Sequence, residues 1–149
     1  MVEKRITLSV DGIIVFPSKN NGNKFILIKR KYPPFQNYLA LPGGYVEYGE
    51  KTEEAVIREI KEETGLDVQI QGLIGVYSDS NRDPRGHCVS ISYICFAIGG
   101  NIKAGDDAND AIKVEFTEDN IEQMSSQIAF DHKKIIIDAI KWFNNRITT

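Results

Sequence analysis

The sequence has few cysteines, no long hydrophobic run and no excess of positive charge. Its two cysteines, Cys88 and Cys95, lie in one apolar stretch rich in β-branched residues. If that stretch is a strand, the two thiols point to opposite faces about 23 Å apart, whereas a disulfide needs Cα atoms within about 7 Å. We therefore expect two reduced, buried thiols. Two cysteines and two separated histidines also make a poor zinc site.

The longest uncharged stretch, from Gly86 to Ile102, is interrupted by Ser, Gly, His and Asn residues. A membrane-spanning helix needs about 20 mostly apolar residues, so this stretch predicts none. The start of the sequence, Met1 to Thr7, also lacks the apolar segment of a secretory signal. We accordingly expect no membrane association and a cytoplasmic location.

The charge balance excludes another class of function. Lys and Arg number 18 against 21 Asp and Glu, which gives a formal net charge of −3. This excludes a broadly basic surface, so we expect no nucleic-acid partner. The 149 residues, 42% of them hydrophobic and 26% charged, have the size and composition of one globular domain. Because no repeat or linker divides them, we predict a single domain over residues 1–149.

Hydrophobic patterning predicts strands interrupted by helices. Residues 5–16 alternate and then turn apolar, and an Asn/Gly turn at 20–23 leads to the apolar run 25–28. This pattern predicts a hairpin over 5–30. Pro42-Gly43-Gly44 is expected to be a loop. Further strands are expected at 38–41, 67–77, 88–98 and 112–116.

Helices are predicted over 52–64, over 118–123 and from Asp131 toward the C-terminus. Thr52 is the expected N-cap of the first helix and Gly65 suits its end, while Asp131 is expected to cap the last helix. That last helix carries one apolar stripe, formed by Ile136, Ala139, Ile140 and Phe143. The order of elements indicates an α/β fold, a mixed sheet with helices on both faces.

The strongest chemical signal lies in the predicted helix over 52–64. Glu59, Glu62 and Glu63 are related as i, i+3 and i+4, so they share one helix face. Exposed carboxylates at this spacing repel one another by roughly a few tenths of a kcal/mol per pair, which a divalent cation would offset. Hard oxygen ligands on a rigid element suit Mg²⁺, although a solvated acidic helix face has the same local pattern.

The residues around this helix complete a longer motif. It reads Gly44, five residues, Glu50, seven residues, Arg58-Glu59, aliphatic Ile60, one residue, Glu62-Glu63, one residue, Gly65 and aliphatic Leu66. Arg58 can pair with Glu62 at i+4, or with Glu50 if the loop folds back, and so orient a ligand carboxylate. Every fixed position matches the Nudix box, and on this motif the sequence resembles the Nudix hydrolase family.

The resemblance implies a Nudix-type α/β/α sandwich around a mixed sheet, and hydrolysis of a nucleoside diphosphate linked to another moiety. The implied ligands of Mg²⁺ or Mn²⁺ are the Gly44 carbonyl and the carboxylates of Glu59, Glu62 and Glu63. The implied orienting pair is Arg58 and Glu50. The metal would polarise the pyrophosphate and activate the attacking water. The general base stays open between Glu62 and four acidic residues beyond the motif: Asp106, Asp107, Asp110 and Glu115.

Within the family, the sequence looks most like ADP-ribose pyrophosphatases. Stretches 33–47, 75–87 and 129–132 carry this resemblance, although position 81 is Asn where those enzymes often have Pro. We expect cleavage of ADP-ribose to AMP and ribose 5-phosphate, with the guanidinium forks of Arg82 and Arg85 matched to phosphate oxygens. The expected substrate-binding residues are Gly43, Gly44, Tyr45, Arg82 and Arg85. One alternative is a Nudix enzyme acting on oxidised nucleoside triphosphates; another is a non-catalytic ADP-ribose-binding module, as in relatives that carry a DNA-binding domain.

Several smaller features allow both a functional and a structural interpretation. His87 suits a base, a phosphate contact or a hydrogen-bonded residue at a strand start. His132, beside Asp131 at a helix start, suits a structural or substrate-flanking place, with a catalytic role as the alternative. Lys29-Arg30-Lys31 is expected to be a solvated charge run at a strand end. A homodimer is expected by analogy alone. An aromatic ring for base stacking, rather than for packing, is sought among Phe35, Tyr45, Tyr48 and Tyr77.

Overall fold

A computed structural model of the chain describes residues 4–102 and 110–147. Within these residues, strands and helices alternate much as the sequence predicts. The strands are β1 (Thr7–Phe16), β2 (Lys24–Lys29), β3 (Leu39–Ala40), β4 (Gly43–Tyr45), β5 (Leu66–Tyr77), β6 (Cys88–Gly100) and β7 (Asp110–Glu115). The helices are α1 (Thr52–Thr64), α2 (Glu118–Gln123), a short 3₁₀ turn (Ser125–Gln127) and α3 (His132–Ile147).

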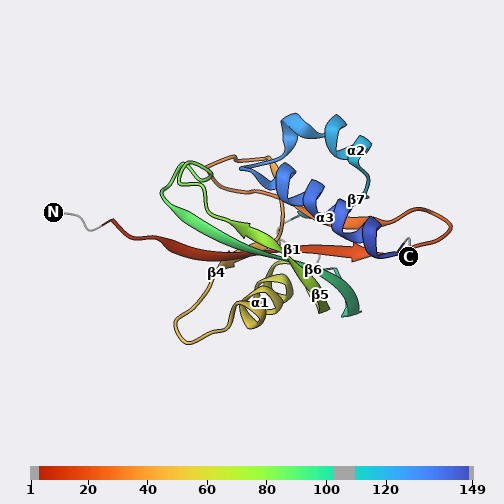
Figure 1. Ribbon diagram of the computed structural model, residues 1–149, viewed down its shortest axis with the longest axis horizontal. Coiled ribbons are helices and arrows are strands. Elements are labelled where there is room, and N and C mark those ends of the chain that lie inside the picture. Colours follow the sequence, from red (N-terminus) through yellow and green to blue (C-terminus); the bar gives the residue numbers. More distant parts are fainter. Residues whose placement is uncertain (1–3, 103–109, 148–149) are drawn as a thin grey trace.

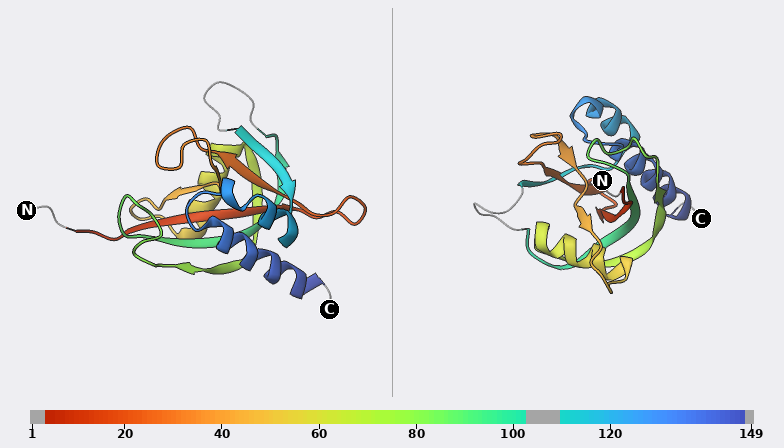
Figure 2. Two further views of the ribbon diagram at one scale, coloured as in Figure 1. Left: turned by 90° about the horizontal axis from the view of Figure 1, so that it is seen from above. Right: turned by 90° about the vertical axis from the view of Figure 1, so that its left-hand side faces the viewer.

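The strands form one mixed sheet whose central order is β3-β2-β1-β6-β5, with β4 paired to β1 and β7 to β2. β1 and β6 run parallel from the pair Thr7 and Cys88 to the pair Val15 and Phe96, and the other described pairs are antiparallel. Helix α1 lies on one side of the sheet, and α2 and α3 lie on the other (Figures 1 and 2). The predicted α/β/α arrangement around a mixed sheet is thus confirmed.

Two hydrophobic cores fill the space between the sheet and its helices. Side chains alternate between the faces of a strand, so β1 and β2 contribute to both cores. Ile13 and Phe25 face α3, where the predicted apolar stripe is buried. Ile14 and Ile26 face α1 and pack with Ile60. The strand alternation in the sequence therefore fixes which face each helix covers.

One predicted loop is a strand, and one predicted strand is shorter than expected. The hairpin of β1 and β2 is confirmed, with Val15 opposite Phe25. The segment predicted over 38–41 is a strand only at Leu39–Ala40. Gly43–Tyr45, expected to be a loop, is β4 and pairs with β1, Gly44 opposite Val10. Glycines carry no strand propensity, so β4 depends on the edge that β1 offers and leaves no local signal.

The helix ends differ from prediction at their N-termini. Gly65 ends α1 in the left-handed region at φ 81°, as predicted. The N-cap of α1, however, is Lys51, whose amide donates to Glu54 Oε1 at 3.0 Å. The Thr52 hydroxyl instead lies 2.7 Å from the hydroxyl oxygen of Tyr93 on β6. The Asp131 side chain does not cap α3 either, because both of its oxygens bind Arg82.

Helix α1 approaches the sheet closely where β1 carries a glycine. A Cβ at Gly12 would collide with the side chain of Ile60, which is fully buried. The absence of a side chain at Gly12 therefore lets the helix pack against β1. This contact sets the height at which the carboxylates of α1 stand over the sheet.

The two cysteines are free and buried, as predicted. Among residues 4–102 and 110–147, no helix is both long and apolar enough to cross a membrane.

Candidate active site

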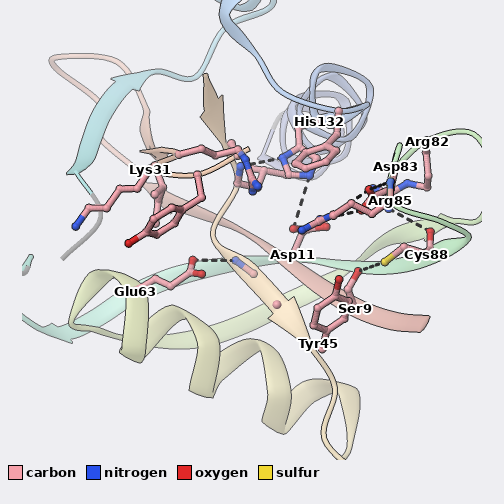
Figure 3. A pocket seen from close by; sticks show the side chains of 18 residues that line it. Ser9, Asp11, Lys31, Tyr45, Glu63, Arg82, Asp83, Arg85, Cys88 and His132 are labelled. Carbon is pink, nitrogen blue, oxygen red and sulfur yellow. Dashed lines mark hydrogen bonds and ion pairs between the residues drawn. The ribbon is translucent and has the colours of Figure 1, made fainter. Parts of the chain in front are cut away.

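A cavity of about 300 Å³ opens beside the end of α1. Its walls come from β1, the segment from β2 to β4, α1, the loop between β5 and β6, and the start of α3. Figure 3 shows Glu63 on one side of this cavity and Arg82, Asp83 and Arg85 on the other. The structure gathers all five predicted substrate-binding residues in its lining: Gly43, Gly44, Tyr45, Arg82 and Arg85.

Beside this cavity, Arg58 and Glu50 form the bidentate pair that the motif suggests. Arg58 Nε donates to Glu50 Oε2 at 2.7 Å, and Nη2 donates to Oε1 at 3.0 Å. These hydrogen bonds lower the pKa of the Glu50 carboxyl and raise the pKa of the Arg58 guanidinium. Because a guanidinium fork matches a carboxylate in two places, the pair fixes the orientation of Arg58.

The oriented Arg58 then holds the carboxylates of α1. Its Nη1 donates to Glu59 Oε1 at 2.8 Å and, more distantly, to Glu62 Oε2 at 3.4 Å. Its Nη2 also donates to the carbonyl oxygen of Tyr45 at 3.1 Å, which connects α1 to β4. Both alternatives in the sequence therefore occur together: Arg58 reaches Glu50 and Glu62 at once.

Glu63 lines the cavity at the end of α1 and is hydrogen-bonded to the sheet. The amide of Gly43 donates to Glu63 Oε2 at 3.1 Å. Burial, together with the charges of Glu59, Asp11 and Glu62, raises the pKa of Glu63 to about 8, against the lowering effect of the Gly43 amide. Four acidic side chains thus act on one another at this end of the cavity.

Glu59 stands directly over Gly44. Burial raises the pKa of Glu59, although Arg58 opposes that shift. A Cβ at Gly44 would collide with the Glu59 carboxylate. Glycine therefore lets the backbone of β4 come this close to the Glu59 carboxylate, which a larger residue would displace.

The donor set of this face suits a hard divalent cation. In the part of the chain that the structure describes, no group of three or more His, Cys, Asp or Glu side chains lies close enough together to hold a metal ion without rearrangement. Arg58 supplies the positive charge that Glu59 and Glu62 face. Oxygen ligands from Glu59, Glu62 and Glu63, close to the backbone of Gly44, are those that Mg²⁺ or Mn²⁺ prefers. The ligand types present therefore fit such an ion, and the side chains would have to converge on it to bind it.

The opposite wall of the cavity is cationic and aromatic, and the sequence analysis missed two of its members, Arg30 and Phe130. Arg30 was predicted to be part of a solvated run, yet it is half-buried and lines the cavity while Lys29 stays exposed. Its Cζ lies 4.8 Å from the ring centroid of Phe130, and Arg85 Cζ lies 5.5 Å from the same centroid. Burial, and then the charge of Arg85, lower the pKa of Arg30. Side chains alternate along a strand, so Arg30 would share the face of Ile28, which is buried. This alternation was the signal in the sequence that could have placed Arg30 toward the interior.

Arg82 lines the cavity, but its guanidinium donates hydrogen bonds to other groups of the protein. Nη2 and Nε donate to the two oxygens of Asp131 at 2.7 and 2.9 Å, and Nη1 donates to the carbonyl of Cys88 at 3.3 Å. Only 5% of the Arg82 side chain is exposed. Arg85 is more open, with 49% of its side chain exposed, and it pairs with the buried Asp83 at 2.8 Å. The two arginines, predicted to act alike, have different surroundings.

His132 and Asp11 form a buried polar group at the base of the cavity. The amide of Leu41 donates to His132 Nδ1 at 3.0 Å, and His132 Nε2 lies 3.8 Å from Asp11 Oδ1. Ser90 Oγ donates to the other oxygen of Asp11 at 2.5 Å. Burial lowers the pKa of His132, which favours the neutral ring. His132 therefore has the structural place that its position suggested, while Asp11 carried no sequence signal.

The remaining candidates lie outside the cavity. Tyr48 is fully exposed, and Tyr77 donates to Asp138 at 2.7 Å beside a separate groove. His87 Nε2 lies 2.9 Å from the carbonyl oxygen of Ser78. Of the proposed bases beyond the motif, Asp110 and Glu115 are exposed on β7. Asp106 and Asp107 lie outside the described residues.

A carboxylate helix braced by an Arg–Glu pair over a Gly-Gly strand, within a mixed sheet covered on both faces, defines a Nudix-type hydrolase. The chain belongs to the Nudix family: the NUDIX domain model matches residues 8–139. A relative described as an ADP-ribose pyrophosphatase, from Methanocaldococcus jannaschii, is 53% identical over 137 residues, which cover 92% of this chain and 75% of the relative.

Two further similarities are informative. An ADPR responsive transcriptional repressor from Acinetobacter baylyi is 27% identical over 93% of this chain and 55% of its own length. The structure of a bifunctional NMN adenylyltransferase/ADP ribose pyrophosphatase from Francisella tularensis, complexed with AMP and a Mn ion, superposes with a TM-score of 0.75 at 25% identity. The similarity covers 93% of this chain and 42% of that protein. The chain thus spans only about half the length of these two relatives.

Proposed function

We propose that the protein is a divalent-metal-dependent hydrolase that cleaves ADP-ribose to AMP and ribose 5-phosphate. The single observation that carries the proposal is the polarity of the cavity. Glu63 and its acidic neighbours form one pole, and Arg30 and Arg85 form the other. The relative from Methanocaldococcus jannaschii, described as an ADP-ribose pyrophosphatase, supports this choice of substrate.

The acidic pole has the roles that the motif implies. Glu59, Glu62, Glu63 and the Gly44 carbonyl would hold Mg²⁺ or Mn²⁺, and Arg58 and Glu50 would orient them. When bound, such an ion neutralises the diphosphate and activates water for attack on phosphorus. Glu62, of which 58% of the side chain is exposed, is the candidate within the motif for accepting the water proton.

The cationic pole would bind the rest of the substrate. Arg85 and Arg30 present guanidinium groups toward an anion, and Gly43, Gly44 and Tyr45 line the path between the poles. Arg82 contributes by holding the wall in place. A diphosphate ester would meet the metal ion at the acidic pole and the guanidinium groups at the cationic pole, so it suits this cavity better than an uncharged ligand.

Three further proposals concern the whole protein. We propose a single functional domain over residues 1–149, a homodimer, and a cytoplasmic location with no nucleic-acid partner. The net charge of −3 supports the absence of a nucleic-acid partner. Gel filtration with light scattering tests the dimer directly.

Product analysis tests the proposed activity. The protein is incubated with Mg²⁺ and ADP-ribose, an oxidised dGTP, NADH, a sugar nucleotide or a dinucleoside polyphosphate, each against an EDTA control. We expect AMP to appear fastest from ADP-ribose, and only with metal. A preference for the triphosphate would keep the carboxylate helix and overturn the substrate. Binding of ADP-ribose without any turnover would favour the sensor alternative.

A further inference from the structure

The loop between β5 and β6 carries one wall of the cavity and is stiffened by its own hydrogen bonds. The amide of Asn81 donates to Asp79 Oδ1 at 2.8 Å, and the amide of Arg85 donates to Asp83 Oδ1 at 2.9 Å. These hydrogen bonds restrict the backbone of the loop at two places. Its position relative to the cavity then depends on the contacts that anchor it.

The main anchor on α3 is the ion pair of Arg82 and Asp131. It is bidentate, with donor–acceptor distances of 2.7 and 2.9 Å, and only 5% of the Arg82 side chain is exposed. Asp131 precedes the first helical residue of α3, where its side chain would normally cap the helix. Here only the backbone carbonyl of Asp131 serves the helix, accepting from the amides of Lys134 and Ile135. The side chain is used for the loop instead.

Phe130, next to Asp131, is held in a conformation that it would not adopt freely. Its φ is 54°, in the left-handed region that favours glycine. The ring packs 4.8 Å from Phe35 and lies beneath Arg30 and Arg85 on the cavity wall. Strained residues persist where their surroundings hold them, and they concentrate at ligand sites. The adjacent ion pair is one of the contacts that hold this backbone.

We propose that Arg82 and Asp131 are positioning residues for substrate binding: their ion pair fixes the loop on the start of α3 and so places Arg85 and Phe130 opposite the carboxylates. This inference rests on the proposed function for the identity of the substrate. Neither residue contacts the carboxylates of α1 in the described residues, so the pair acts on binding and leaves the chemical step alone. Removing it should raise KM and spare kcat.

The test compares Asp131→Asn and Arg82→Lys with the wild type, using ADP-ribose and Mg²⁺. Each variant weakens the bidentate pair and so displaces Arg85 and Phe130, and losing an interaction that binds the ground state and the transition state equally raises KM, so we expect KM to rise roughly 10-fold or more. We expect kcat to stay within about 3-fold of the wild type. The control is Glu122→Gln, which removes a nearby exposed ion pair with Lys133 at 2.8 Å and should change neither constant.

A second readout needs no substrate. Hydrogen–deuterium exchange should accelerate over residues 78–87 in Asp131→Asn, while the amides of α1 keep their wild-type rates. Unchanged KM and unchanged loop exchange would overturn the proposal, and so would a fall in kcat at constant KM. If the wild type releases no AMP from ADP-ribose, the proposed function fails, and the exchange experiment still decides the anchoring role of the pair. Global unfolding of Asp131→Asn shifts the decision to Arg82→Lys, which keeps the charge.

Discussion

The backbone amide of Gly43 donates to the Glu63 carboxylate at 3.1 Å, which joins the sheet to the end of α1. The two residues are separated by α1 and by the loop that precedes it. Through this bond β4 lies against an acidic side chain of α1 that lines the cavity. The Gly-Gly pair and the carboxylates of the motif therefore form one structural unit.

In this unit, the close contact between β4 and the Glu59 carboxylate depends on the glycine at position 44. In Gly44→Ala, the new Cβ would meet the Glu59 carboxylate and displace it from the backbone of β4. We expect kcat to fall roughly 10²-fold, as for a misplaced catalytic group, with little change in melting temperature. Steady-state kinetics and thermal melting measure the two effects. The control is Gly99→Ala, where the nearest atom to the new Cβ is Asp67 Oδ2 at 3.5 Å. Equal activity in both variants would contradict the close approach.

The buried position of Glu63 predicts a pH-dependent stability. Its pKa is raised from 4.5 to about 8, so the folded metal-free protein keeps a proton that the unfolded chain has released. The free energy of unfolding should therefore fall as the pH rises from 7 to 8, by on the order of 1 kcal/mol. His132, whose folded pKa is lowered from 6.5, is partly protonated only in the unfolded chain near pH 7, so it adds a small slope of the opposite sign that fades toward pH 8.

Chemical denaturation in EDTA at several pH values measures this slope. Glu63→Gln should remove it, because the amide does not titrate. Excess Mg²⁺ should also remove it, since a bound cation favours the charged carboxylate. A metal-free wild type whose stability is constant between pH 7 and 8 would show that Glu63 is not buried as described.

Arg58 is predicted to act through its fork and not through its charge alone. Lysine keeps the charge but cannot donate to Glu50, Glu59 and the Tyr45 carbonyl together. We expect Arg58→Lys to lower kcat roughly 10- to 100-fold, the usual scale for losing a residue that orients metal ligands. Arg146→Lys, at a distant site where Arg146 stacks over Trp142 at 3.9 Å, is the matched control. If Arg58→Lys turned over substrate at the wild-type rate, the positive charge of Arg58 alone would account for its role.

The sequence predicts those features that depend on local periodicity. Helix α1 spans Thr52–Thr64 as expected, because its end at Gly65 and its buried positions are encoded along the helix itself. The acidic face of the motif is predicted for the same reason, since i, i+3 and i+4 spacing fixes a common face. The two-sided core also follows from the alternation in β1 and β2.

Features that depend on distant partners are not predictable in this way. Asp131 has the sequence position of a helix cap, but its side chain binds Arg82, which is 49 residues away. Thr52 likewise loses the capping role and lies near Tyr93. Arg30 resembles any solvated residue at a strand end until Phe130 is brought beside it. In each case a tertiary contact replaces the local preference, and one sequence alone does not record that contact.

The turnover of Glu62→Gln and Glu63→Gln, together with their Mn²⁺ affinity, tests most directly whether the carboxylates of α1 hold the catalytic metal ion. We expect each substitution to lower kcat for ADP-ribose roughly 10²- to 10⁴-fold and to weaken Mn²⁺ binding while the fold is retained. Glu62 is 58% exposed, so its replacement leaves the core intact. Near-normal turnover and Mn²⁺ affinity in both variants would show that the carboxylates of α1 are only a solvated helix face.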